Sequence, residues 1–228
     1  MRHPAVWLLT CALLAVAATA RAQDAGVDRA ASPARWEAAV GFAWFRGMSL
    51  GDSTATLEQP NGQPFTLFKT ETSMGGGPGV ALTLGRYATP RLFIETAFAY
   101  ARPDVSTKVT ADAEEAPSVT STIGLHQYVV EGSARWHLAR SWGRFSPYLR
   151  AGAGYLRQLD ADHDHVEAGV LLHAGGGVDR VMKSRPGARI DSMGLRLEAR
   201  LTGRTGGFDV EDRTRLGGAA AALLFLTF

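Results

Sequence analysis

The sequence predicts an all-β fold, an eight-stranded antiparallel up-and-down transmembrane β-barrel that covers residues 35–228. Three observations lead to this prediction. Segments of alternating apolar and polar residues recur along the chain, charged residues stand mid-segment on one face, and long connections alternate with short ones. Alternating strands, an interior filled by side chains and unequal connections are typical of small membrane barrels.

The first 34 residues precede this fold. The apolar run Ala5–Ala20 leads into Ala20-Arg21-Ala22, a small-x-small cleavage site. We expect residues 1–22 to be a secretory signal peptide and residues 23–34 a periplasmic N-terminal segment. A membrane anchor is the alternative, which the shortness of the run disfavours. The single cysteine, Cys11, lies inside the run, so the mature chain has no disulfide and no thiol nucleophile or ligand.

Composition excludes two classes of protein. The 228 residues are 46% hydrophobic and 20% charged, which suits one folded domain and argues against long disorder. The formal net charge is only +2, and basic residues are interspersed with acidic ones, so we expect no nucleic-acid partner.

Eight segments supply the strands, and each alternates with period two. In the first, Trp36, Val40 and Phe42 share one face and Glu37 lies on the other. The same alternation indicates a half-buried strand in every later segment. In order, the segments are residues 36–44, 80–87, 92–100, 127–138, 147–155, 170–179, 195–202 and 216–228.

The polar face favours a barrel lumen over a soluble sandwich. It carries charged residues among Gly and Ala, whereas the outer face of a soluble sheet would be rich in Lys, Thr and Ser. These charged residues are Glu37, Glu95, Glu131, Arg135, Arg150, Asp179, Arg196, Glu198 and Arg200. Five acidic and four basic side chains nearly cancel, as a packed ion-pair network requires. We expect pairs such as Glu131 with Arg135 and Glu198 with Arg200 to fill the lumen rather than to act as acid–base machinery.

Connections and aromatic residues orient the barrel. Residues 46–73 and 103–120 form long connections, which we place outside, whereas residues 88–91 and 139–143 form short periplasmic turns. Residues 157–165, 182–192 and 203–213 follow; the second is long for a turn and weakens the register there. Two aromatic girdles are expected, Trp36, Trp136, Phe145 and Phe228 at the periplasmic end and Trp44, Tyr100 and Tyr155 at the outer end.

The two long connections are predicted to be hairpins that extend the first four strands above the membrane. The turn signal Asn61-Gly62 separates two β-prone arms, and residues 111–116 separate two more. An exposed sheet edge of this kind pairs with other chains, which motivates a binding role. Shielding of the barrel mouth is an equally weighted alternative.

Several motifs resemble a known family. The stretches 145–156 (FSPYLRAGAGYL), 173–179 (HAGGGVD) and 194–203 (GLRLEARLTG), with the terminal Phe228, resemble the OmpA/OmpX/opacity-protein type of outer-membrane barrel. The resemblance implies a cell outer membrane location, in Gram-negative bacteria, after export through the periplasm. It implies contact with outer membrane lipids and lipopolysaccharide. It further implies that the barrel-assembly machinery reads the alternate residues of the closing strand, which are Ala222, Leu224, Leu226 and Phe228.

Two motifs were tested for chemistry. Asp160–His165 (DADHDH) has metal-ligand residue types, but neighbours in an extended chain point apart, so a solvated polar loop is favoured. His126 precedes Tyr128, whereas lipid A deacylases have a serine two residues from the histidine, so the nucleophile–base pair is missing. We therefore expect no catalytic, cofactor-binding or metal-binding residues, and no enzyme.

Three functions remain in order of preference. The first is a non-enzymatic, monomeric barrel with a structural or surface-interaction role, exercised through the outer hairpins on a possible surface protein partner. The second is a narrow pore for small solutes, if the charged lumen is loosely packed. The third is a lipid A-modifying membrane enzyme, which would require an outward-facing nucleophile.

Overall fold

The computed structural model describes residues 35–58, 63–110, 117–138, 144–160, 165–185, 187–208 and 213–228. The expected signal peptide and N-terminal segment lie outside these residues. The strands are β1 (Trp36–Phe45), β2 (Met48–Glu58), β3 (Pro64–Met74), β4 (Gly77–Tyr87), β5 (Leu92–Ala101), β6 (Asp104–Thr110), β7 (Val119–His137), β8 (Phe145–Asp160), β9 (Val166–Ser184), β10 (Ser192–Gly206) and β11 (Arg215–Thr227). Within the described residues, no helix is long and apolar enough to span a membrane.

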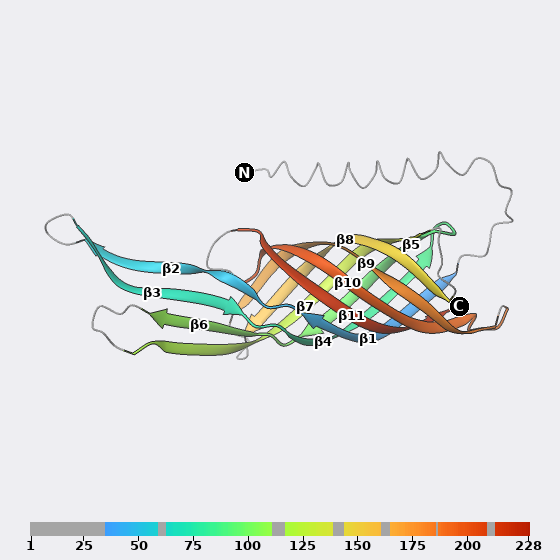
Figure 1. Ribbon diagram of the computed structural model, residues 1–228, viewed down its shortest axis with the longest axis horizontal. Coiled ribbons are helices and arrows are strands. Elements are labelled where there is room, and N and C mark those ends of the chain that lie inside the picture. Colours follow the sequence, from blue (N-terminus) through green and yellow to red (C-terminus); the bar gives the residue numbers. More distant parts are fainter. Residues whose placement is uncertain are drawn as a thin grey trace, which may run out of the picture. The chain divides into compact units, whose positions relative to one another are not determined.

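Eight of these strands close into an antiparallel barrel, as predicted. Neighbouring strands follow the order β1, β4, β5, β7, β8, β9, β10 and β11, and β11 pairs back with β1. Each strand therefore lies beside its predecessor in the barrel, which is the up-and-down arrangement (Figure 1). Closure gives every barrel strand two partners, so the wall has no free edge.

The last described residue completes this closure. The amide of Phe228 donates to the carbonyl of Trp36 at 2.9 Å, and the amide of Trp36 donates to the carbonyl of Phe228 at 2.9 Å. Both aromatic side chains point outward, and Phe228 is 51% exposed. Trp136 at the end of β7 and Phe145 at the start of β8 lie at the same end of the barrel, so the four aromatic residues expected to form the periplasmic girdle share one end.

The two faces of the wall are those that the alternation predicted. Leucine, valine and phenylalanine side chains cover the outside, with Phe42 73% and Leu201 75% exposed. Soluble proteins rarely leave so continuous an apolar surface exposed. Eight of the nine predicted inward charges are buried, and the ninth, Arg200, is nearly so.

Three further strands form a sheet that projects from one end of the barrel (Figure 1). β2 pairs with β3, β3 with β6, and β6 with the first part of β7, Val119–Gly124. We call this four-stranded unit the extension sheet, the end that carries it the extension end, and the opposite end the turn end. The predicted extension of the first four strands by two hairpins is confirmed. The turn residues Asn61-Gly62 and 111–116 lie outside the described residues.

Three predicted connections are shorter than expected. β8 continues to Asp160, β9 to Ser184 and β10 to Gly206, so strand structure covers much of the predicted connections 157–165, 182–192 and 203–213. The alternation continues at the ends of β8 and β10, with Gln158 and Arg204 buried on the inward side, whereas the last five residues of β9, Arg180–Ser184, are all exposed. The predicted weak register does occur, as a shift between Met193 and Gly194 where β10 pairs with β9.

Candidate functional site

The lumen at the turn end holds a four-membered cluster of charges. Arg135 donates to Glu37 at 2.7 Å and to Asp179 at 3.1 Å, while Arg196 donates to Glu37 at 2.7 Å and to both oxygens of Asp179 at 2.7 and 3.1 Å. Arg196 and Asp179 stand directly opposite each other on β10 and β9. Each carboxylate thus lies between two guanidinium groups. The contact of Arg196 with Asp179 is bidentate, the geometry that favours arginine over lysine.

Aromatic rings pack against these guanidinium groups. The Cζ atom of Arg135 lies 4.2 Å from the centre of the Phe93 ring, and that of Arg196 lies 5.3 Å from the Phe225 ring. Tyr148 contacts both, at 5.2 and 5.7 Å. Cation–π contact and exclusion of water strengthen the ion pairs beneath the rings. Gly177 makes room for this packing, since a Cβ atom there would lie 2.5 Å from the Tyr148 hydroxyl.

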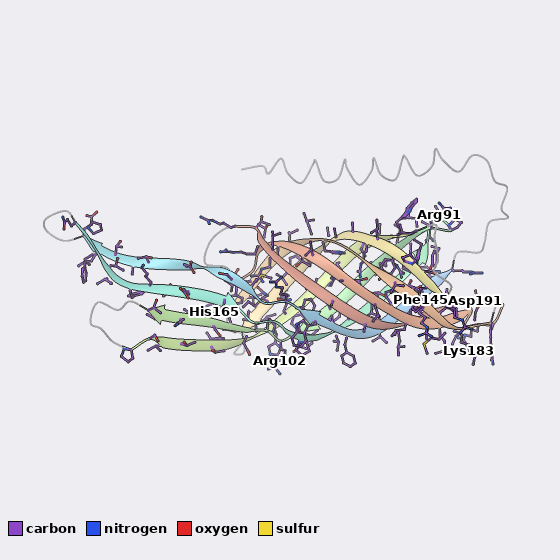
Figure 2. The ribbon with its side chains drawn as sticks, in the orientation of Figure 1. Arg91, Arg102, Phe145, His165, Lys183 and Asp191 are labelled. Carbon is purple, nitrogen blue, oxygen red and sulfur yellow. The ribbon has the colours of Figure 1, made fainter. Side chains whose placement is uncertain are left out.

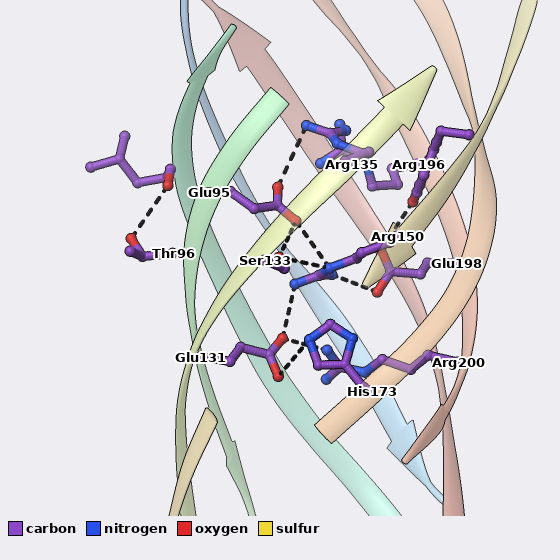
Figure 3. A network of polar contacts seen from close by, with 12 residues as sticks. Glu95, Thr96, Glu131, Ser133, Arg135, Arg150, His173, Arg196, Glu198 and Arg200 are labelled. Atoms are coloured by element: carbon purple, nitrogen blue, oxygen red, sulfur yellow. Dashed lines mark hydrogen bonds and ion pairs between the residues drawn. The ribbon is translucent and has the colours of Figure 1, made fainter. Parts of the chain in front are cut away.

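A second cluster is centred on Arg150 (Figure 3). Its guanidinium contacts Glu198 at 2.6 Å, Glu131 at 2.9 Å and Glu95 at 3.1 Å. The Tyr148 hydroxyl donates to the second oxygen of Glu198 at 2.9 Å. One buried arginine is therefore neutralised by three carboxylates from three other strands, which ties the wall together across the lumen.

Glu95 joins the two clusters. Arg135 and Arg150 lie directly opposite each other on β7 and β8, an arrangement that would be destabilising by itself. The Glu95 carboxylate lies between them, with Oε2 3.5 Å from Arg135 and Oε1 3.1 Å from Arg150. The side chain of Ser133 also donates to this carboxylate at 3.1 Å. The two clusters are consequently one continuous network.

The pairs expected from sequence are not the pairs that form. Glu131 contacts Arg150 and Arg200 rather than Arg135, and Glu198 contacts Arg150 rather than Arg200. Glu131 and Arg135 are four residues apart on a strand, about 13 Å, which is too far for an ion pair. Glu198 and Arg200 are only two residues apart, about 7 Å, but each contacts a partner from another strand across the narrow lumen. His173 joins the same group, with Nε2 3.6 Å from Glu131.

Polar and apolar side chains close the lumen toward the extension end. Gln158 donates to Gln127 at 2.8 Å, and Arg204 donates to the carbonyl of Phe208 at 2.7 Å. Above them a buried cluster of Leu50, Met74 and Leu125 is flanked by further apolar residues. Arg204 adds a fifth basic side chain to the lumen, so the charges balance. It was missed because it was assigned to a connection, although it continues the inward series of β10.

Two small voids lie in the described part of the lumen. One of about 10 Å³ is lined by Glu131, Arg150, Glu198 and Arg200 among others, and one of about 50 Å³ lies nearer the extension end, beside Gln127 and Arg204. A single water requires about 10–15 Å³ of such space. The void within the charged network thus has space for about one water, and the void nearer the extension end has space for a few.

The structure describes the contacts of His126 and the two ends of the motif Asp160–His165. His126 accepts or donates a 2.8 Å hydrogen bond with the Tyr100 hydroxyl and stacks on that ring. Asp160 and His165 lie 3.4 Å apart at the end of β8, and residues 161–164 fall outside the described part of the chain. In the described ranges, no group of three or more His, Cys, Asp or Glu is arranged to hold a metal ion.

The extension sheet is amphipathic. Pairing across the strands places Ala55 beside Phe68, Leu57 beside Phe65, and Val105 beside Ile123 on one face, which also carries Thr70, Thr72, Thr107 and Ser121. The other face carries Thr54, Lys69, Glu71, Lys108 and Thr122. The apolar face continues the inward series of β7, because Ile123 has the parity of the buried Leu125 and Gln127.

This apolar face and both edges of the extension sheet are uncovered in the described part of the chain. Phe65 and Phe68 are each 40% exposed, Ile123 is 53% exposed and Val119 is 62% exposed. β2 pairs only with β3, and Val119–Gly124 pairs only with β6, because β8 joins β7 from Leu125 onward. Unpaired edges beside exposed apolar side chains are sites where another chain can add a strand.

Comparisons with known proteins identify the fold. No protein-family model matches the sequence, and no curated protein matches it. Among solved structures, the outer membrane protein OprG from Pseudomonas aeruginosa is 11% identical with a TM-score of 0.50, over 86% of this chain and 96% of that chain. Neisserial surface protein A is 16% identical with a TM-score of 0.48, and the match covers 88% of this chain and 100% of that chain. The similarity to OprG shows that this chain has the fold of an outer membrane β-barrel.

Proposed function

We propose that this chain is a non-enzymatic outer membrane protein whose lumen is sealed and whose function is surface interaction through the extension sheet. The observation that carries the proposal is the contrast between the two parts of the structure. Ion pairs and rings fill the barrel, with Arg135 0% exposed, whereas the extension sheet leaves two edges and an apolar face uncovered. The partner that fits is a protein segment able to add a strand to the sheet.

Membrane insertion is supported by the exposed apolar wall between two sets of aromatic side chains. The outward residues Val40, Leu82 and Leu149 are 57%, 52% and 58% exposed, which lipid would cover. We expect the folded protein in the outer membrane fraction to resist SDS at room temperature and to shift on a gel after boiling. Recovery as a soluble periplasmic protein with no heat-modifiable band would contradict this part of the proposal.

Surface interaction is tested by charges placed on one face of the extension sheet. Phe68→Lys with Ile123→Lys puts two charges on the apolar face, and we expect binding of cells to their partner surface to fall to the level of cells that lack the protein. The matched control is Thr54→Lys with Thr122→Lys, which adds the same charge to the polar face, on β2 beside β3 and on β7. Equal binding by both double variants would show that the apolar face does not contact the partner.

A further inference from the structure

The exposed charge at the turn end is almost entirely of one sign. Eight exposed basic residues lie there, in the turns or within the last residues of the strands, and we call them the basic rim. They are Arg35, Arg86, Arg91, Arg144, Arg180, Lys183, Arg185 and Arg189. In the described part of the chain, one partly exposed acidic residue lies among them, Asp191, which is 3.5 Å from Arg35. Figure 2 shows Arg91, Lys183 and Asp191 at this end of the barrel.

The extension end does not share this bias. Its exposed charges in the described ranges are mixed: the acidic ones are Asp52, Glu58, Glu71, Asp104 and Glu167, and the basic ones are Arg46, Lys69, Arg102, Lys108, Arg157 and Arg213. The net charge of the whole chain is only +2, but the charge is unevenly distributed, and the positive potential is concentrated at the turn end.

Arginine and aromatic side chains are paired within the basic rim. Phe145 and Arg180 are cross-strand neighbours on β8 and β9, and the Arg180 Cζ lies 5.4 Å from the centre of the Phe145 ring. Trp36 and Arg86 are cross-strand neighbours on β1 and β4 in the same way. Phe145 is 42% and Trp36 43% exposed, so both pairs face the surroundings of the barrel. An aromatic ring lies at the depth of lipid headgroups in a bilayer, which places the adjacent guanidinium beside the phosphates.

We infer that the basic rim is a binding surface for anionic phospholipid headgroups of the leaflet at the turn end. A guanidinium group donates two parallel hydrogen bonds to a phosphate, and several such groups around the barrel would hold a shell of anionic lipid. The inference rests on the proposed membrane insertion. The basic rim should bind a lipid that has a phosphodiester and a net negative charge, such as phosphatidylglycerol, more tightly than a zwitterionic lipid with the same acyl chains.

The test counts lipids bound to the full chain purified from membranes in a neutral detergent. Phosphatidylglycerol and phosphatidylcholine with the same acyl chains are added in equal amounts, and native mass spectrometry measures how much of each is retained. Each basic residue near an anionic headgroup contributes about fivefold in binding. We expect about fivefold preference for phosphatidylglycerol, the effect of one basic residue per headgroup, and a loss of roughly three eighths of the retained phosphatidylglycerol in the variant R86Q/R180Q/K183Q, which removes three of the eight rim charges.

The control variant R102Q/K108Q/R157Q removes three exposed charges at the extension end and should keep the preference. Loss of retained phosphatidylglycerol to the same extent in both variants would show that net charge, and not the basic rim, determines lipid binding, which overturns the inference. Equal retention of the two lipids by the wild-type protein would also overturn it. Displacement of bound lipid by equal free glycerol phosphate would show that phosphate alone is recognised, which also overturns it. A heat-modifiable, membrane-inserted protein without lipid preference refutes only the inference, whereas failure to insert refutes the proposed function as well.

Discussion

At the scale of single residues, the carboxylates of the lumen are held by partners that cannot be replaced by water. Glu198 accepts from Arg150 at 2.6 Å and from Tyr148 at 2.9 Å, and it is 7% exposed. Removal of Glu198 leaves Arg150 with Glu95 and Glu131 but leaves the buried network one negative charge short, and desolvation makes that imbalance costly. The network therefore acts as a unit, and its members are sensitive to substitution even though each ion pair alone would contribute little.

Replacement of Glu198 by Leu should lower the free energy of unfolding by about 3–5 kcal/mol, because Arg150 loses its shortest contact in a buried site. The matched control is Leu197→Ala, one residue away on the outward face, where Leu197 is 49% exposed. This control should cost about 1–2 kcal/mol, since only the transfer of apolar groups is lost. Urea unfolding in lipid vesicles measures both, and equal losses would show that the lumen is wet and loosely packed.

The sequence indicates which residues face the lumen but not which of them pair. Parity alone places Glu37, Arg135 and Asp179 inward, because every strand alternates and each carries its charge mid-strand. Their contacts depend on the tilt and stagger of the strands around the barrel, which no short stretch encodes. Glu37 and Arg135 are 98 residues apart along the chain, and only closure of the barrel joins them.

Strand ends were the other source of error. Gln158 and Arg204 occupy alternate positions that continue the inward faces of β8 and β10. Both lie beyond the mid-strand charged residues on which the predicted strand bounds depend.

The extension sheet was predicted because turn residues and β-prone arms are local signals. The amphipathic character of that sheet depends on the registers of β2 with β3 and of β6 with β7, which include two irregular steps in β2 and β3. Those registers became known only from the structure.

At the scale of elements, the closing strand depends on its last residue. Phe228 and Trp36 exchange two backbone hydrogen bonds, and both rings lie at the turn end. Deletion of Phe228 removes both bonds and one ring of the expected periplasmic girdle, so assembled protein in the outer membrane should fall several-fold while synthesis and export continue. Surface labelling against total protein measures the effect. Unchanged surface levels would show that the β1–β11 seam does not depend on this residue.

The extension sheet should be separable from the barrel. β1 pairs with β4 and β11 along its whole length, and neither of these ladders uses β2 or β3. Replacement of residues 53–72 by a short turn should therefore leave a heat-modifiable barrel of nearly unchanged unfolding midpoint, while binding to the partner surface is lost. Loss of the heat-modifiable form would mean that the sheet is required for the barrel to fold.

At the scale of the whole molecule, the described chain has a filled barrel between two chemically different ends. The extension end carries mixed charge and an uncovered amphipathic sheet, and the turn end carries the basic rim. Balanced charges inside, with Arg204 as the fifth basic side chain against five acidic ones, explain how so many ionised groups are accommodated in a narrow interior. The proposed interactions use the ends of the molecule, whereas the ion pairs lie in its interior.

The central claim is that the ion-pair network seals the lumen, and planar-bilayer conductance tests it most directly. Purified wild-type protein should insert without steady current, since the described voids in the network have space for isolated waters only. Glu198→Leu should not create a current selective for cations or anions, because neighbouring side chains still block the path. A stable wild-type conductance whose ion selectivity changes in Glu198→Leu would contradict the sealed barrel and establish a narrow pore instead.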